Sequence, residues 1–227
     1  MHKFAYVVWL DRVADRDALE GHLLERAAPR LRAGGGRERV VNVVDVEASL
    51  RASMPLVREA GSLAGLVTLR AEAPGGPEGI EEIARAVPGR IAGYRVAESI
   101  PLDWERPTAP AGRPTPGVKL VTLFDKPKDL SEADFHREWH EVHTPLSLEI
   151  HPLWRYVRNA VERRVAPAGP AFRGIVEETF RTLEDVVDPE RFYGSRANMK
   201  RVAEHVTTFI DLERIETGLM REYRLDA

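Results

Sequence analysis

The chain has 227 residues, 43% hydrophobic and 30% charged, so it is long enough for one large domain or for two domains of about a hundred residues. Its formal net charge is -3, from 33 basic and 36 acidic residues, and it has no basic patch interleaved with aromatic residues, so nucleic acid is not an expected partner. Cysteine is absent, which excludes disulfides, thiolate-held metals and cysteine nucleophiles.

Membrane insertion also has no support in the sequence. No apolar run approaches the roughly 20 residues that a spanning helix needs, and residues 1–10 are too short and wrongly flanked for a signal peptide. We therefore expect a cytoplasmic protein with no membrane partner.

The first half of the chain alternates strand-like and helix-like segments. Strands are predicted where β-branched and aromatic residues gather, and helices where apolar residues recur at helical spacing. The Gly34-Gly35-Gly36 run follows a helix and precedes a strand, the reverse of a phosphate-binding loop, so we interpret it as a turn. The expected order is a strand at 3–10, a helix at 15–32 starting at Asp15, strands at 39–47 and 63–72, a short helix at 78–87 and a strand at 90–102.

Residues 105–117 are rich in Pro, Gly and small polar residues, which is typical of a semi-rigid linker. The pattern then begins again, so we expect one repeat at 1–104 and a second at 118–227. The second should have strands at 118–124, 153–165 and 172–182, helices at 131–143 and 189–210, and a last strand within 213–225.

An offset of 116 aligns the first part of each half without a gap. It places Asp15 on Ser131, Leu23 on Trp139 and Pro29 on Pro145, and we infer an internal duplication. The same offset places Glu20, Leu24 and Ala27 on three histidines of the second half, His136, His140 and His143. The first half therefore shows that the scaffold does not need these histidines.

The helix at 131–143 carries these histidines beside an apolar face. Ser131 is a suitable N-cap, with Asp134 placed to bond back to it. At about 100° per residue the apolar face holds Phe135, Trp139, Val142 and Leu146, and the histidines lie about 100° away. Pro145 predicts that the helix kinks or ends just after His143.

Two strand-helix-strand-strand-helix-strand halves predict an α+β fold of two ferredoxin-like repeats, whose sheets pack as a dimeric α/β barrel within one chain. The sequence also resembles the EthD-like family of that superfamily over about residues 118–224. The resemblance is carried by the spacing of Phe135, Trp139, His143 and Pro145, by the segment from Arg155 to Asn159, and by the segment from Phe172 to Phe180. It implies a small hydrophobic or aromatic ligand, often no cofactor, and either polyketide-type chemistry or a link to an oxidative degradation system.

His143 is the first candidate catalytic residue, because imidazole titrates near neutrality and the family pattern marks this position. The alternative is a histidine that caps backbone carbonyls next to Pro145. His140 is a second candidate, with a solvent-exposed position as the alternative, and His136 is expected to be solvated. The stripe resembles a metal site, but no second His, Asp or Glu cluster is evident, so no metal is expected.

Four residues outside the stripe complete the candidate site. Glu177 and Glu178 point to opposite faces of their strand, and Glu177, which fits the family pattern better, is proposed as catalytic or as one half of a structural ion pair. Tyr156 and Asn159 lie on opposite faces of their strand, and either could orient a substrate, with a core position as the alternative for Tyr156. Trp139 is expected to form a pocket wall or part of the core.

The leading hypothesis is a cofactor-free enzyme in which His143, assisted by His140 and Glu177, performs acid/base chemistry in cyclisation, dehydration or decarboxylation of a small carbonyl compound. One alternative is an oxidoreductase, either a monooxygenase or a haem protein with a histidine ligand. The other is a non-enzymatic binding protein. Edge strands and apolar helix faces would permit a homodimer.

Overall fold

The computed structural model describes residues 1–10, 16–33, 36–51, 63–72, 89–105, 109–110, 112–165 and 169–225. The helix expected at 78–87 and the cap at Asp15 lie outside these residues. In the described part of the chain, no helix is long and apolar enough to cross a membrane.

The strands lie close to their expected positions. The first predicted strand is β1 (His2–Leu10), and the strand at 118–124 matches β5 (Val118–Phe124) at both ends. The one predicted at 39–47 ends early, because α3 (Val46–Arg51) begins there. The remaining strands are β2 (Arg37–Val44), β3 (Leu63–Ala71), β4 (Gly89–Leu102), β6 (Arg155–Val165), β7 (Gly174–Phe180) and β8 (Ile215–Arg224).

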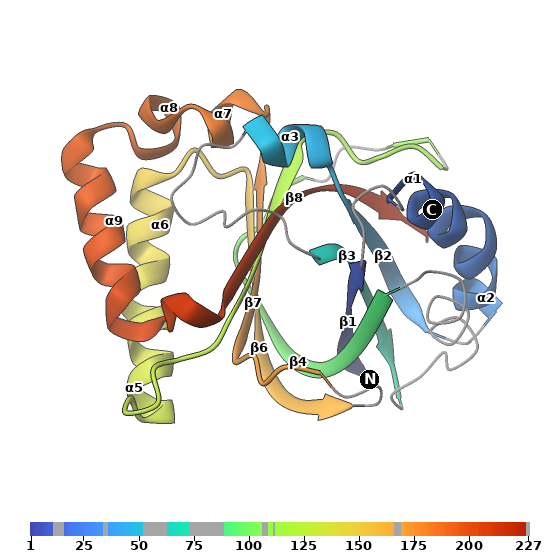
Figure 1. Cartoon of the computed structure of the whole chain (residues 1–227), viewed down its shortest axis with the longest axis horizontal. Helices are drawn as coiled ribbons and strands as arrows, with labels where there is room; N and C mark the ends of the chain where they lie inside the picture. The colour runs from blue at the N-terminus through green and yellow to red at the C-terminus, as the bar shows by residue number, and fades with distance from the viewer. Residues whose placement is uncertain are drawn as a thin grey trace.

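The eight strands close into one antiparallel barrel (Figure 1). Each half forms a ferredoxin-like sheet, β4-β1-β3-β2 in the first and β8-β5-β7-β6 in the second. The two sheets are joined at both edges, where β2 pairs with β8 and β4 pairs with β6. This is the predicted fold of two repeats in one chain.

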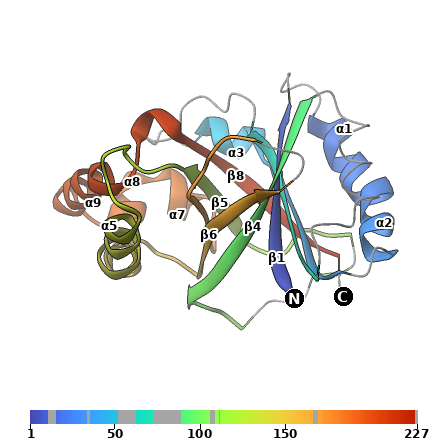
Figure 2. The same cartoon turned by 90° about the horizontal axis from the view of Figure 1, so that it is seen from below.

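Helices cover the barrel on opposite sides (Figure 2). On the first repeat, α1 (Arg16–Gly21), η2 (His22–Ala27) and α2 (Ala28–Ala33) run on as one helix. On the second repeat, the corresponding helix is α5 (Glu132–Arg137), η3 (Glu138–His143) and α6 (Thr144–Ile150). The predicted helix 189–210 is divided into α8 (Pro189–Tyr193) and α9 (Arg196–Phe209) at Gly194, whose φ of 68° ends the first piece, and a short α7 (Glu184–Val187) precedes them.

The expected N-cap is present, since the Asp134 amide donates to Ser131 Oγ over 3.0 Å. Of the two expectations for Pro145, a kink or an end just after His143, the end is wrong, because α6 continues the helix. The helix passes Pro145 through the π-helical turn η3, in which the Thr144 amide donates to the Trp139 carbonyl, five residues back. This turn leaves the His140 carbonyl without a helical partner, and Arg158 Nη1 of β6 donates to it over 3.3 Å.

The π-helical turn also changes which residues face the sheet. One extra residue in the turn rotates the following part of the helix, so Ser147 is buried where Leu146 was expected. Val142, predicted on the apolar face, is 42% exposed, and His143 takes the inward position. The first repeat has the same device at the same offset, because η2 lies 116 residues before η3, with Ala27 in the place of His143.

Candidate active site

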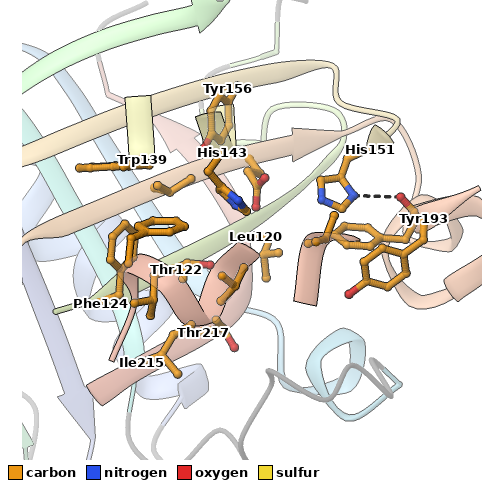
Figure 3. Close-up of a pocket in the computed structure, with 17 residues that line it drawn as sticks. Leu120, Thr122, Phe124, Trp139, His143, His151, Tyr156, Tyr193, Ile215 and Thr217 are labelled. Carbon is orange, nitrogen blue, oxygen red and sulfur yellow. Dashed lines mark hydrogen bonds between the residues drawn. The ribbon is translucent and has the colours of Figure 1, made fainter. Parts of the chain in front are cut away.

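A cavity of about 70 Å³ lies between the second repeat's sheet and its helices. At the ~10–15 Å³ that one water molecule requires, the cavity has room for about five. Apolar and aromatic side chains form most of its wall, among them Leu120, Phe124, Trp139, Val176, Val206 and Phe209. The polar side chains of the wall are Thr122, His143, His151, Tyr156, Glu178, Tyr193 and Thr217, most of which are labelled in Figure 3.

His143 reaches the cavity from the π-helical turn. Its Nδ1 atom lies 3.3 Å from Nδ1 of His205 on α9, and His205 Nε2 lies 3.3 Å from Oε2 of Glu138. Burial, together with the nearby His205 and His151, lowers the pKa of His143 to about 3. The ring is therefore neutral at pH 7 and has one unprotonated nitrogen.

His151 is a second cavity histidine, and sequence reasoning did not single it out. It follows the end of α6, and its Nδ1 donates to the Phe192 carbonyl over 2.9 Å, so the other ring nitrogen of the neutral form is an acceptor (Figure 3). Burial lowers the pKa of His151 to about 4, although the bond to the carbonyl opposes this shift. The only feature of the sequence that could have indicated His151 is its position just beyond the helix that carries the other histidines.

Glu178 is the carboxyl group of the cavity. It comes from β7 opposite Leu120, on the same strand face as Val176 and Phe180. The first repeat has Leu69 at the matching register, opposite Phe4. Surrounding protein buries Glu178 apart from the surface it turns to the cavity, and this burial raises its pKa to about 7. Near neutral pH the carboxyl group therefore holds a proton about half of the time.

The other two histidines of the stripe do not line the cavity. His140 turns toward Arg158, and burial, together with Arg158 and His136, lowers its pKa to about 4. Its Nε2 atom is buried and has no hydrogen-bond partner among the described residues. His136 lies beside it, with the ring centroids 5.2 Å apart. Of the histidine stripe, the structure thus brings only His143 to the cavity.

Trp139 and Tyr156 line the cavity, whereas Glu177 and Asn159 lie inside the barrel. Glu177 Oε2 accepts from Lys119 Nζ over 2.7 Å, and its Oε1 accepts from the Asn159 amide over 3.1 Å. Burial alone would raise the pKa of Glu177, but Lys119 and Lys3 outweigh it and hold the pKa well below the usual range. The alternative interpretation of Glu177, a structural ion pair, describes these contacts.

The described residues contain no cluster of three or more His, Cys, Asp or Glu that could hold a metal ion. The donor set is one of proton-transfer groups, with two neutral imidazoles and one carboxyl group that titrates near neutrality.

Comparison with solved structures identifies the same fold in other proteins. An anthrone oxidase-like protein superposes with a TM-score of 0.60 at 9% identity, covering 100% of this chain and 94% of that one. A candidate monooxygenase from Fusobacterium nucleatum subsp. nucleatum gives a TM-score of 0.55 at 7% identity, covering 99% and 93%. At such identities the likeness establishes the fold alone. No curated protein matches this chain.

The sequence itself matches one family model, that of the EthD domain, over residues 127–213. The matched residues begin just before α5 and end within the turn that precedes β8. They include the three elements that bring His143, His151 and Glu178 to the cavity. The match confirms the resemblance seen in the sequence, and the matched residues lie on the second repeat of a dimeric α/β barrel formed within one chain.

Proposed function

We propose that this protein is an enzyme that removes a proton from a small hydrophobic carbonyl or phenolic compound, with His143 as the base. The observation that carries the proposal is a neutral imidazole that faces an apolar, aromatic cavity and has Nδ1 occupied by a neighbouring ring. Its Nε2 is left to accept a proton from the ligand. Trp139 and Tyr156 would contact the ligand from the helix and the sheet.

The reaction that we favour is oxidation of the resulting carbanion by dioxygen. The carbanion adds O₂, the peroxide takes up a proton, and loss of water leaves a carbonyl group, so that CH₂ and O₂ become C=O and H₂O. The fold likeness to an anthrone oxidase-like protein and to a candidate monooxygenase supports this choice. His143 takes the first proton, and the apolar wall suits both a hydrophobic substrate and O₂.

A second candidate reaction rests on Glu178. A carboxyl group with a pKa of about 7 can donate a proton to a departing hydroxyl group, so His143 and Glu178 together could remove water across a carbon–carbon bond. The same pair would serve the cyclisation, dehydration or decarboxylation expected from the sequence. Both reactions begin with the same proton transfer to His143.

The shared first step can be tested without knowing the natural substrate. The probe is 2-indanone in D₂O under nitrogen, and the measurement is deuterium uptake next to the carbonyl group. We expect the wild-type protein to accelerate uptake, and His143→Ala to lose at least ~100-fold of that acceleration. His136→Ala is the matched control, because His136 lies on the same helix outside the cavity, and it should keep full activity.

The fate of the carbanion is then determined by repeating the reaction in the presence of oxygen. Uptake of one ¹⁸O atom from ¹⁸O₂ into 2-indanone would support oxidation, whereas conversion of 3-hydroxy-1-indanone to 1-indenone without oxygen uptake would support dehydration. A folded His143→Ala variant with wild-type exchange would disprove the role of His143. A wild-type protein that binds 2-indanone and accelerates no exchange would favour the non-enzymatic binding protein.

A further inference from the structure

His143 alone is a weak base, because burial disfavours the charge that it would gain. The structure contains a second histidine that could take this charge. His205 on α9 separates His143 from a groove on the outer surface, between α6 and α9. His205 lines that groove, whereas His143 lines the cavity, so the two rings together connect the cavity with the outside.

We propose that His143, His205 and Glu138 form a proton relay, which fixes the nitrogen that His143 presents to the ligand and moves the proton's charge to the groove. This inference rests on the proposed function, since it assigns positioning residues to the same site. The relay consists of the Nδ1 to Nδ1 contact of 3.3 Å and the Nε2 to carboxylate contact of 3.3 Å.

The geometry of the two rings suits a hydrogen bond. Their planes lie within 11° of parallel, their centroids are 5.4 Å apart and their Nδ1 atoms are 3.3 Å apart, so the facing nitrogens are close enough to share a proton. Phe209 packs beside both rings, with centroid distances of 4.9 Å to His143 and 5.5 Å to His205. The apolar neighbour keeps water away from this bond.

The carboxylate of Glu138 determines the tautomers of both rings. An ionised carboxylate only accepts, so His205 Nε2 carries a proton, and in neutral His205 the Nδ1 atom is then an acceptor. His143 must therefore donate from Nδ1, and its Nε2 lone pair is left for the ligand. Without Glu138 either nitrogen of His143 could be protonated, and the base would be present only part of the time.

The same bonds allow the charge to move. When His143 takes a proton at Nε2, it passes its Nδ1 proton to His205 Nδ1. His143 is then neutral again, and His205 is an imidazolium beside the Glu138 carboxylate. The reverse transfer follows when His143 gives its Nε2 proton to an intermediate, so the cycle needs no outside proton.

Several charged side chains surround His205 on the groove side. On the helix that ends in α6, Glu141 and Glu149 face the groove, and Glu204 does so on α9. The cations that pair with these carboxylates and with Glu138 are Arg201, 2.9 Å from Glu149, Lys200, 3.5 Å from Glu204, and Arg137, 3.2 Å from Glu138. On the cavity side the titratable groups are His151, which is neutral, Glu178, which titrates near neutrality, and Tyr156 and Tyr193. Acidic groups therefore outnumber basic ones on the groove side.

The first test of the relay is structural and needs no substrate. Protein labelled with ¹⁵N at histidine should show His143 at neutral pH as the tautomer protonated at Nδ1, and Glu138→Gln should shift it toward the Nε2-protonated form. Glu204→Gln, a groove carboxylate that pairs with Lys200 instead, is the matched control and should leave the His143 signals unchanged. An Nε2-protonated His143 in the wild-type protein would overturn the proposal.

The second test uses deuterium uptake by 2-indanone. His205→Gln keeps a hydrogen-bonding side chain but cannot carry a proton, so it and Glu138→Gln should lower kcat on the order of tenfold or more, with little change in KM and an altered pH profile. Wild-type kcat and pH profile in both variants would reject the relay and leave His143 as the base. The expected tautomers without any catalysed exchange would reject the proposed function and leave the relay as a positioning device.

Discussion

Two neighbouring glutamates of β7 have opposite environments, although they differ by one position. Glu177 faces the barrel interior and is held ionised by Lys119 and Lys3, whereas Glu178 faces the cavity and is held partly protonated by burial. Strand alternation predicts the opposite orientations. Alternation alone could not predict which of the two glutamates faces the cavity, because both faces of this sheet are buried and both carry apolar residues.

The two glutamine variants should therefore change stability in opposite directions. Glu177→Gln removes one partner of a buried ion pair and should cost about 3–5 kcal/mol of unfolding free energy. Glu178 has a folded pKa raised from 4.5 to about 7, so the wild-type protein loses stability as pH rises from the lower to the higher value. Glu178→Gln removes that loss and should be about 2–3 kcal/mol more stable than wild type at pH 8.

Urea unfolding at pH 5 and pH 8 measures both effects, with the exposed Glu190→Gln as the control. Activity should show the opposite pattern to stability. Glu178→Gln, the more stable variant, should impair proton donation in the cavity, whereas Glu177→Gln, the less stable variant, should not. If Glu177→Gln were stable and inactive, Glu177 would be the catalytic carboxylate expected from the sequence.

At the scale of the element, the π-helical turn η3 decides which histidine reaches the cavity. It is supported from outside the helix, because Arg158 Nη1 donates to the His140 carbonyl over 3.3 Å and to Thr144 Oγ1 over 3.0 Å. Arg158→Met keeps an unbranched side chain, shorter by two atoms, and removes both of these bonds together with the one that Arg158 Nε donates to Ser99 Oγ over 3.0 Å. We expect the unfolding free energy to fall by about 1–3 kcal/mol, since the His140 carbonyl is left unsatisfied. Hydrogen exchange should also become faster at residues 138–144.

Arg163→Met, on the exposed part of the same strand, is the control and should change neither quantity. Unchanged exchange in Arg158→Met would mean that the turn needs no support from β6. In that case Pro145 alone would account for the π-helical turn.

Element-level patterns predicted much of this structure. Side-chain character and alternation placed β5 at both ends, and Ser131 with Asp134 placed the start of α5. The π-helical turn could not be predicted, because a fixed rotation per residue assigns Val142 inward and His143 sideways. His205 lies 62 residues from His143, and a lone histidine on an amphipathic helix carries no signal of its partner.

At the scale of the whole molecule, the inferred duplication would let one half serve as scaffold while the other carries the proposed site. Both edges of each sheet are used to close the barrel, so the described part of the chain has no free edge strand for a homodimer. The edge-strand route to a homodimer is therefore wrong for these strands, and the apolar helix faces remain the other expected route. The first repeat keeps the helix and its π-helical turn but has Ala27 and Leu69 in place of His143 and Glu178.

This division of roles predicts how the fold responds to acid. His143 and His151 are neutral when buried, with folded pKa values of about 3 and about 4 against the usual 6.5. The unfolded chain therefore binds more protons than the folded chain below pH 6.5, and stability contributed by the neutral rings is lost as pH falls from there toward the folded values. Between pH 7 and pH 5, each histidine should lower the unfolding free energy by about 2 kcal/mol.

Glu178 has the opposite effect, because its contribution to the unfolding free energy becomes more favourable as pH falls over the same range. The histidine effect must therefore be measured as a difference between variants. Unfolding free energies at pH 7, 6 and 5 should fall less steeply in His143→Gln and His151→Gln than in wild type, because glutamine does not titrate. His136→Gln, on the same helix outside the cavity, should follow the wild-type curve. Parallel curves for all four proteins would show that these rings are protonated in the folded state, and the neutral base on which the proposed chemistry depends would be lost.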